Sequence, residues 1–276
     1  MQLSVAARTD IGMIRAGNED SFFADANQFR GLFIVADGMG GHAAGEVASE
    51  MAVQIVTKEL SSVQRLNGDD VAPRVAAALR NANRAIFLRT VEEVDKQGMG
   101  TTASVLLLAN DRYLIGQVGD SRVYLLRDGV LRQLTKDHSY VQEQVDAGFL
   151  TPEQARYHPY SNVITRCVGA SESVEPDTYG GAVKAGDIFL VASDGLTGMV
   201  DDRRLQQLLL ARSSPGRLVD SLIAEANGRG GLDNITAIVI QVSALDEQQQ
   251  KETPAAGSPT LEVPTYPRGG GDGGKR

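Results

Sequence analysis

Four aspartates stand where an apolar run meets its neighbouring segment. Three follow such a run, namely Asp37 in FIVAD, Asp120 in GQVGD and Asp194 in LVASD, and Asp233 precedes one in GLDNIT. In an antiparallel sheet the start of one strand lies beside the end of the next, so all four carboxylates could meet at one edge. A single acid in this position is usually a turn residue or a helix N-cap. Four of them in similar contexts indicate a shared site.

Converging carboxylates repel one another unless a cation lies between them. Oxygen ligands alone select hard ions, so we expect Mg²⁺ or Mn²⁺ in preference to zinc or copper. The histidines do not argue otherwise, because His42, His138 and His158 lack the spacing of a zinc motif. His138 and His158 are expected to be surface or capping residues. The sequence therefore predicts a site for divalent metal ions.

The stretch RAGNEDSF supplies the complementary charge. Arg15 lies four residues before Glu19 and five before Asp20. A guanidinium can hold a phosphate through two parallel hydrogen bonds, and it cannot lose its charge. For Arg15 alone, a surface salt bridge is the simpler interpretation. Beside a pair of metal ions, phosphate binding becomes the stronger hypothesis.

The same region allows a second chemistry. GMGGHA, which begins at Gly38, matches the G-x-G-x-x-A pattern of a dinucleotide site, with Glu59 about twenty residues further on. The context argues against this alternative. The segment KELSSVQRL around Glu59 does not resemble a strand, and the carboxylate of Asp37 would face the pyrophosphate.

Composition limits the class of protein. The chain has 276 residues, of which 42% are hydrophobic and 22% charged, as in soluble globular proteins. It contains no apolar stretch of membrane-spanning length, and its start, MQLSVAARTD, lacks the pattern of a secretory signal, so we expect a cytoplasmic protein with no membrane partner. The single cysteine, Cys167, excludes an intrachain disulfide, and the net charge of −8 disfavours nucleic acid as a partner.

Short apolar runs predict the strands, and residues repeating every three or four positions predict the helices. One helix would bury Val47, Met51 and Ile55, and a second would bury a stripe that includes Val75 and Ile86. Two more helical stretches precede the last strand. The expected strands are 3–9, 22–25, 31–36, 101–109, 112–119, 122–127, 130–135, 187–193 and 235–242.

Helices in pairs and strands joined by hairpins, such as the one expected at Asp128-Gly129, predict an α+β fold with antiparallel sheets and outer helices. We predict one domain over residues 1–243, with a polar, helix-prone insert at about 139–161. Residues 244–276 are rich in Gly and Pro and should be disordered.

Six motifs along the chain resemble those of a known enzyme family. RAGNED, ADGMGGH, GTTA, VGDSR, SDGL and DNIT, in this order, resemble the metal-dependent protein phosphatases of the 2C family in their compact bacterial form. The resemblance implies a four-layer α-β-β-α sandwich of two antiparallel sheets flanked by helix pairs. It also implies hydrolysis of phosphoserine and phosphothreonine in proteins by a hydroxide activated between two metal ions, without a phosphoenzyme.

The resemblance assigns the metal ligands. It implies that Asp37 bridges two ions of Mn²⁺ or Mg²⁺, with the carbonyl of Gly38 as a further ligand. Asp194 and Asp233 would hold the first ion, and Glu19 would hold the second, through water or directly.

The remaining roles follow from the same resemblance. Asp20 would orient the ligands of the second ion, and Arg15 would hold the substrate phosphate. Asp120 matches the position of a third, weaker metal in bacterial members. The insert at 139–161 matches a mobile flap beside the active site.

One position departs from many eukaryotic members, which have a histidine directly after the Asp-Gly. Here the residue is Met39, and the nearest histidine, His42, is a candidate general acid. The family implies phosphorylated proteins as partners, among them a bacterial serine/threonine kinase and its substrates, and we expect a monomer. A phosphoprotein-binding pseudophosphatase without turnover is the other alternative, although every metal position is filled.

Overall fold

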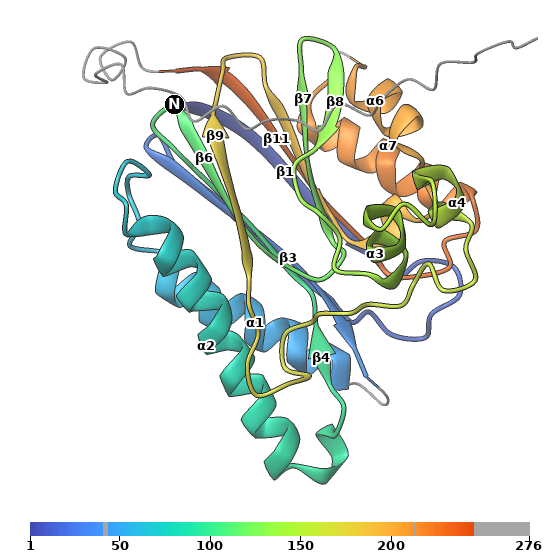
Figure 1. Ribbon diagram of the computed structural model, residues 1–276. Coiled ribbons are helices and arrows are strands. Elements are labelled where there is room, and N and C mark those ends of the chain that lie inside the picture. The colour runs from blue at the N-terminus through green and yellow to red at the C-terminus, as the bar shows by residue number, and fades with distance from the viewer. Residues whose placement is uncertain (41–43, 212, 246–276) are drawn as a thin grey trace, which may run out of the picture.

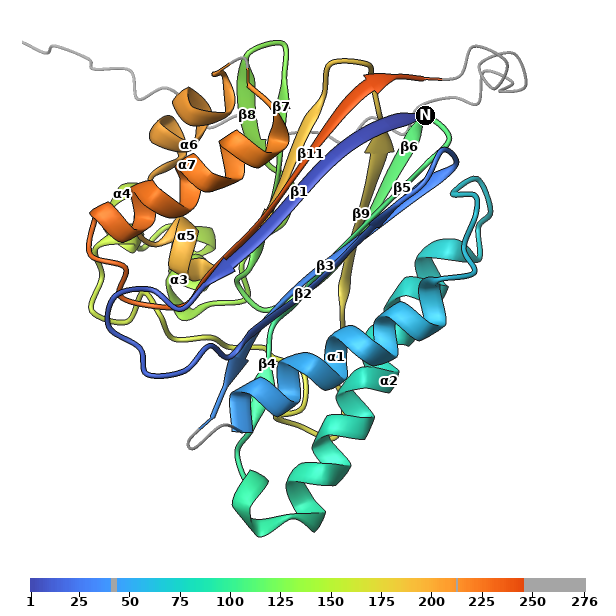
Figure 2. The same cartoon turned by 180° about the vertical axis from the view of Figure 1, so that it is seen from behind.

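The computed structural model describes residues 1–40, 44–211 and 213–245, and it consists of two antiparallel sheets packed face to face (Figures 1 and 2). The first sheet has the order β1 (Gln2–Asp10), β11 (Ile235–Ala244), β10 (Ile188–Ala192), β7 (Arg122–Arg127) and β8 (Val130–Gln133). The second has the order β2 (Asp20–Ala26), β3 (Arg30–Met39), β5 (Ala103–Ala109), β6 (Arg112–Val118) and β9 (Asp177–Ala182), and β4 (Gly100–Thr101) also pairs with β3.

Helices cover both outer faces of this pair of sheets. The helices α1 (Ala44–Leu60) and α2 (Val71–Glu92) lie on the second sheet, followed by the short η1 (Val94–Lys96). The helices α5 (Asp194–Thr197), α6 (Asp202–Leu209) and α7 (Pro215–Gly228) lie on the first. The predicted α+β fold, a four-layer sandwich, is confirmed.

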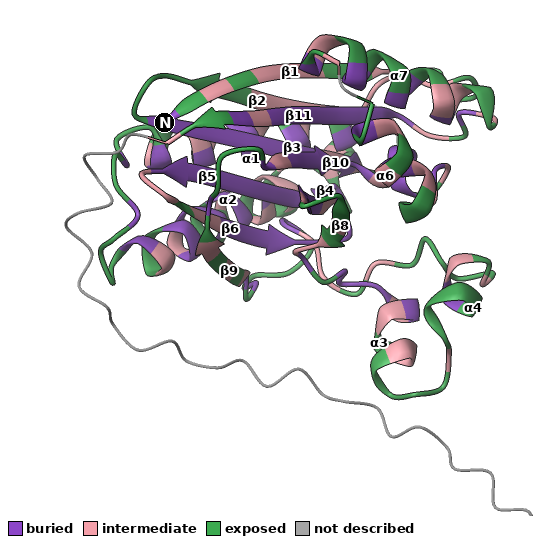
Figure 3. Ribbon diagram, turned by 90° about the horizontal axis from the view of Figure 1, so that it is seen from above, coloured by how far each residue is buried: buried purple, intermediate pink, exposed green. Residues whose placement is uncertain are grey.

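The insert forms α3 (Tyr140–Asp146) and α4 (Pro152–Arg156), which stand apart from the layers when the molecule is seen from above (Figure 3). Among the helices that the structure describes, none combines the length and the apolar character needed to cross a bilayer. The predicted tail lies almost entirely outside the described residues, although β11 extends to Ala244.

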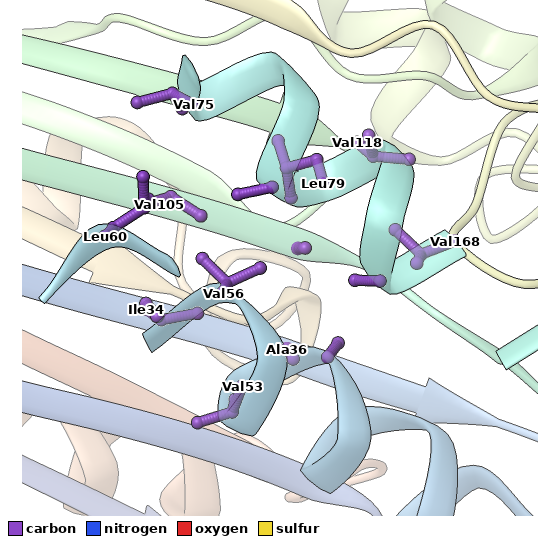
Figure 4. Packing of buried hydrophobic residues seen from close by; sticks show 14 of the residues in the cluster. Ile34, Ala36, Val53, Val56, Leu60, Val75, Leu79, Val105, Val118 and Val168 are labelled. Carbon is purple, nitrogen blue, oxygen red and sulfur yellow. The ribbon is translucent and has the colours of Figure 1, made fainter. Parts of the chain in front are cut away.

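The core consists of three hydrophobic clusters, one between the sheets and one under each helical layer. Strand β3 contributes to two of them, because alternate side chains of a strand point to opposite faces. Phe33 and Val35 pack between the sheets, whereas Ile34 and Ala36 face α1 and α2 (Figure 4). Burial on both faces explains why this strand is a continuous apolar run in the sequence.

The buried face of α1 differs from the prediction. Val47, Met51 and Ile55 are only half buried, whereas Ala48 and Ala52 are fully buried. Alanines let the helix axis approach the sheet closely, and the larger residues lie at the edge of the contact. The stripe predicted for α2 is fully buried.

Local signals predicted most but not all of the strand structure. The Asp128-Gly129 turn joins β7 to β8 with positive φ at both residues, as predicted. The edge strand β9 was missed, because its sequence DTYGGA contains two glycines and little apolar character. Strand β3 continues to Met39 because β4 pairs with Gly38 and Met39, so the prediction that the strand ends at Asp37 was wrong.

The dinucleotide alternative is contradicted by the topology. Strand β3 pairs antiparallel with both β2 and β5, and Glu59 lies inside α1 rather than at the end of a strand. A dinucleotide fingerprint requires a parallel βαβ unit at this position.

Candidate metal centre

The predicted acids come from both sheets and meet at one end of the sandwich. Asp37 lies in β3 and is the register partner of Asp20, the first residue of β2. Asp120 lies in the turn between β6 and β7, Asp194 begins α5 two residues after the end of β10, and Asp233 comes two residues before β11. The structure therefore brings together residues that are up to about 200 positions apart in the chain.

The backbone of Asp37 is fixed on both sides by the GTTA motif. Its N–H donates to Oγ1 of Thr102 (2.9 Å), and its carbonyl accepts from the N–H of Thr102 and from Oγ1 of Thr101 (2.9 Å each). Burial raises the pKa of the Asp37 carboxyl well above its usual range, and the nearby Asp20 and Asp194 raise it further. Asp37 is thus held at a place where burial and the neighbouring acids disfavour its ionised form.

Three more carboxyl groups share this environment. Burial raises the pKa of Asp20 to about 7, although Ser193 Oγ donates a hydrogen bond to its Oδ2 (2.8 Å). Burial raises the pKa of Asp120 well above its usual range, with Asp194 as the next cause, and burial also raises the pKa of Asp194. Within the described residues, Oδ1 of each of these three acids is buried without a hydrogen-bond partner.

Burial, mutual repulsion and missing hydrogen-bond partners indicate whether these acids suit a metal ion. In the described part of the chain, no three His, Cys, Asp or Glu side chains already form a group that could hold one. The donor set nevertheless has the right chemistry, since buried carboxylate oxygens that repel each other and lack donors gain most from a cation. Oxygen ligands suit Mg²⁺ or Mn²⁺. The chemistry of the donor set, although not a preformed geometry, therefore fits a hard divalent ion.

Arg15 contacts one of the predicted ligands. Its Nη2 donates to Oδ2 of Asp233 (2.6 Å), and both side chains are partly exposed. The neighbouring Asn234 joins the two loops, because its Oδ1 accepts from the N–H of Glu19 (2.8 Å). Burial raises the pKa of Glu19, and Arg15 acts in the opposite direction. Arg15, Glu19 and Asp233 therefore form one charged group beside the buried acids.

Gly38 permits the close packing that places this group. A Cβ at Gly38 would overlap the carbonyl oxygen of Gly45, in the first turn of α1, and would lie 2.6 Å from the carbonyl oxygen of Glu19. Only glycine lets β3, the Glu19 loop and the helix start approach each other this closely. The predicted candidate general acid, His42, lies outside the described residues.

A cavity of about 650 Å³ separates the acids from the insert. Asp120, Asp194 and Asp233 line one side of it, and Val141 and Val145 of α3 line the other. Arg156 of α4 also joins the insert to the main domain, because its Nη2 donates to the carbonyl of Gly198 (3.1 Å). The acids and the insert therefore line one cavity, which is large enough to hold a ligand.

The expectation that His138 is a surface or capping residue was wrong. Its side chain is buried, and its Nδ1 accepts from the N–H of Gly119 (3.1 Å). Its own N–H donates to the carbonyl of Gly119, and its carbonyl accepts from the N–H of Thr165 (2.9 Å each). His138 thus fastens both ends of the insert to the turn that carries Asp120. A lone histidine between two polar residues gave no sign of this in the sequence.

Fold and site together define a class. A sandwich of two antiparallel sheets between helical layers, with clustered carboxyl groups beside an arginine, is the architecture expected of a metal-dependent phosphatase.

Comparisons with known proteins agree with this class. The model of the family "Protein phosphatase 2C" matches residues 15–221, and the chain belongs to that family. The serine/threonine phosphatase stp of Listeria monocytogenes is 40% identical over 238 residues, which are 85% of this chain and 94% of that protein.

Two further comparisons concern the phosphatase PstP. The PstP protein of Mycobacterium tuberculosis is 41% identical over 90% of this chain, but the match spans only 46% of that longer protein. A crystal structure of a PstP catalytic domain in complex with two manganese ions is 40% identical, with a TM-score of 0.78, over 88% of this chain and 99% of that one. The predicted family, fold and enzyme class are confirmed.

Proposed function

We propose that this chain hydrolyses phosphoserine and phosphothreonine in proteins with a pair of Mn²⁺ or Mg²⁺ ions. One observation carries the proposal. Two acids that each have a buried oxygen without a hydrogen-bond partner, Asp120 and Asp194, line the cavity beside the insert, together with Asp233. Relatives named serine/threonine phosphatases, and a manganese pair in one of them, support the same conclusion.

The residues divide between two ions as the family pattern indicates. Asp37 would hold both ions, and the carbonyl of Gly38 would be a further ligand. Asp194 and Asp233 would hold the first ion, and Glu19 would hold the second. When bound, the ions would lower the pKa of a water molecule and neutralise charge on the phosphoryl oxygens.

Other residues would support this centre. Asp20, held by Ser193, would orient the ligands of the second ion, and Asp120 would hold a third, weaker ion. Arg15 is held by Asp233, which lines the cavity, and would exchange this carboxylate for the substrate phosphate, which it can bind with two hydrogen bonds. Thr101 and Thr102, which bond the backbone of Asp37, would keep it in position during the reaction. The insert would act as a flap over the bound peptide.

The partners follow from this chemistry. We propose phosphorylated proteins as substrates, among them those of a bacterial serine/threonine kinase, with the enzyme acting as a monomer in the cytoplasm. Nucleic acid is not proposed as a partner, because the chain carries a net charge of −8.

The test is hydrolysis of a phosphothreonine peptide and of para-nitrophenyl phosphate, with and without added Mn²⁺. The proposal expects turnover of both compounds that depends on the metal. A pseudophosphatase would bind the phosphopeptide without releasing phosphate. Binding without turnover at saturating Mn²⁺ would replace the proposed activity with that alternative.

A further inference from the structure

Three large apolar side chains are exposed beside the candidate metal centre. Met13 and Ile14 lie in the loop between β1 and β2 and are 66% and 67% exposed, and Leu232 lies in the loop before β11 and is 56% exposed. We call these three residues the apolar rim. Single exposed apolar residues are common, but a contiguous group marks a surface that another molecule covers.

The apolar rim is built by two loops that hold each other in place. The N–H of Met13 donates to the carbonyl of Gly231 (2.7 Å). The side-chain amide of Asn234 donates to the carbonyls of Ile11 and Gly17 (2.9 Å each), which fixes the first loop at both ends. In Figures 1 and 2 the blue loop after β1 runs beside the red-orange segment before β11. The loops thus present the side chains outward in a preformed surface, which lowers the entropic cost of binding.

A glycine makes this close pairing possible. Gly12 has φ +80°, and a Cβ there would overlap the carbonyl oxygen of Asp233 and lie 2.8 Å from that of Gly231. The apolar loop is therefore packed directly on the backbone of a predicted metal ligand.

The apolar rim is continuous with the proposed binding site. Arg15 directly follows Ile14 and pairs with Asp233, which directly follows Leu232. Leu232 also lines the cavity that contains Asp120 and Asp194. A polypeptide whose phosphate is held at Arg15 therefore lies next to residues that adjoin the rim on both loops.

We propose that the apolar rim binds an apolar side chain of the substrate protein, close in sequence to the phosphorylated serine or threonine. The inference rests on the proposed function and specifies its substrate class. An extended peptide rises about 3.3 Å per residue, so a side chain within about three positions of the phosphorylated residue can reach the rim. Metal binding and phosphate hydrolysis do not require this contact; it determines which phosphorylated segments bind well.

The test compares two phosphothreonine peptides that differ only in having leucines or serines at the three positions on each side. The wild-type protein should show a kcat/KM about tenfold higher for the leucine peptide, mainly through KM, as expected for burying part of two apolar side chains. In the double variant Met13→Gln, Ile14→Gln this preference should be lost. The matched control Val91→Gln changes a side chain that is 63% exposed on α2, outside the apolar rim, and should keep the preference.

Several results would overturn the proposal. Equal kcat/KM for both peptides in the wild-type protein would do so, as would an equal loss for both peptides in the double variant. Sedimentation that shows a wild-type dimer, dissociated by the double variant, would assign the rim to a second copy of the chain. If wild-type protein with Mn²⁺ hydrolyses neither peptide nor para-nitrophenyl phosphate, the proposed function fails. In that case, fluorescence anisotropy with the same two peptides, labelled, still shows whether the protein binds the leucine peptide more tightly.

Discussion

Arg15 and Asp233 form the most exposed contact of the candidate centre, and this contact shows what single residues do there. The guanidinium of Arg15 is paired with Asp233 and places a positive charge beside the other carboxylates. Without it, these carboxylates would repel a phosphate. The sequence could indicate that both residues belong to the site, because the chemistry of each motif points to a metal ligand or a phosphate-binding group. It could not predict that Arg15 pairs with Asp233, because 218 positions separate them.

Replacing Arg15 by alanine should therefore weaken substrate use more than metal binding. We expect a loss of roughly 2–4 kcal/mol in kcat/KM for a phosphopeptide, as for other charge-paired contacts. Steady-state kinetics with the peptide, with Mn²⁺ calorimetry as the control, measures both effects. An unchanged kcat/KM would mean that Arg15 serves only in the surface salt bridge.

Asp120 tests the proposal of a weaker third ion. It is a strand-end acid outside the proposed pair, and a site with few protein oxygens keeps most of its waters and binds weakly. In Asp120→Ala we expect two tightly bound Mn²⁺ ions and an intact fold, with a sharp fall in peptide turnover. Calorimetric titration and kinetics check this together. Loss of the tight pair would place Asp120 in the core site, and normal turnover would make its role structural.

At the level of elements, close contacts between backbones set the site. Strand β3 lies against the start of α1 at Gly38 and Gly45, and β4 extends β3 beyond Asp37. The apolar pattern predicted β3 and both flanking helices. It could not show which face of α1 is buried or that two residues of β4 lengthen β3, since both depend on contacts between distant segments.

Gly38→Ala should destabilise the fold, because the added methyl group meets backbone atoms that cannot move independently. We expect the free energy of unfolding to fall by about 1–3 kcal/mol, the usual cost of overpacking. Urea unfolding measures it. The control Gly216→Ala, in α7 with nothing within 4 Å of the new Cβ, should lose no stability and should gain up to about 1 kcal/mol, because alanine is favoured over glycine in a helix. Equal losses in both variants would contradict the packing account.

The His138 anchor of the insert should make stability depend on pH. Burial lowers the pKa of His138, although the facing Asp177 opposes this and Arg166 adds to it. The unfolded chain therefore binds a proton more readily, and the folding stability present above pH ~6.5 is lost as the pH falls through the folded pKa.

The variant His138→Asn should lose this part of the pH dependence while keeping an acceptor for the N–H of Gly119. Urea unfolding of wild type and variant at pH 5 and pH 7.5 gives the comparison. An identical loss of stability on acidification in both proteins would show that His138 does not contribute.

At the scale of the whole molecule, two sheets place acids from β2, β3, β10 and the segment before β11 at one end of the sandwich. Paired helices and strands joined by hairpins predicted this layered arrangement, because burial on one or both faces gives each helix and strand a periodic apolar pattern in the sequence. The edge strand β9 left none, since its glycines and half-exposed residues carry little apolar pattern. The insert was predicted as helix-prone, but its attachment through His138 depends on contacts with Gly119 and Thr165.

Titration of the wild-type protein and of Asp37→Asn with Mn²⁺, followed by phosphopeptide hydrolysis in the same samples, tests the central claim most directly. The wild-type protein should bind two ions tightly and have no activity in excess chelator. The variant should lose the tight pair, and its kcat should fall at least ~10³-fold, about 4 kcal/mol of lost transition-state stabilisation. Full activity of the wild-type protein in excess chelator, or an Asp37→Asn variant that still binds both ions and turns over normally, would contradict a metal pair held by these carboxylates.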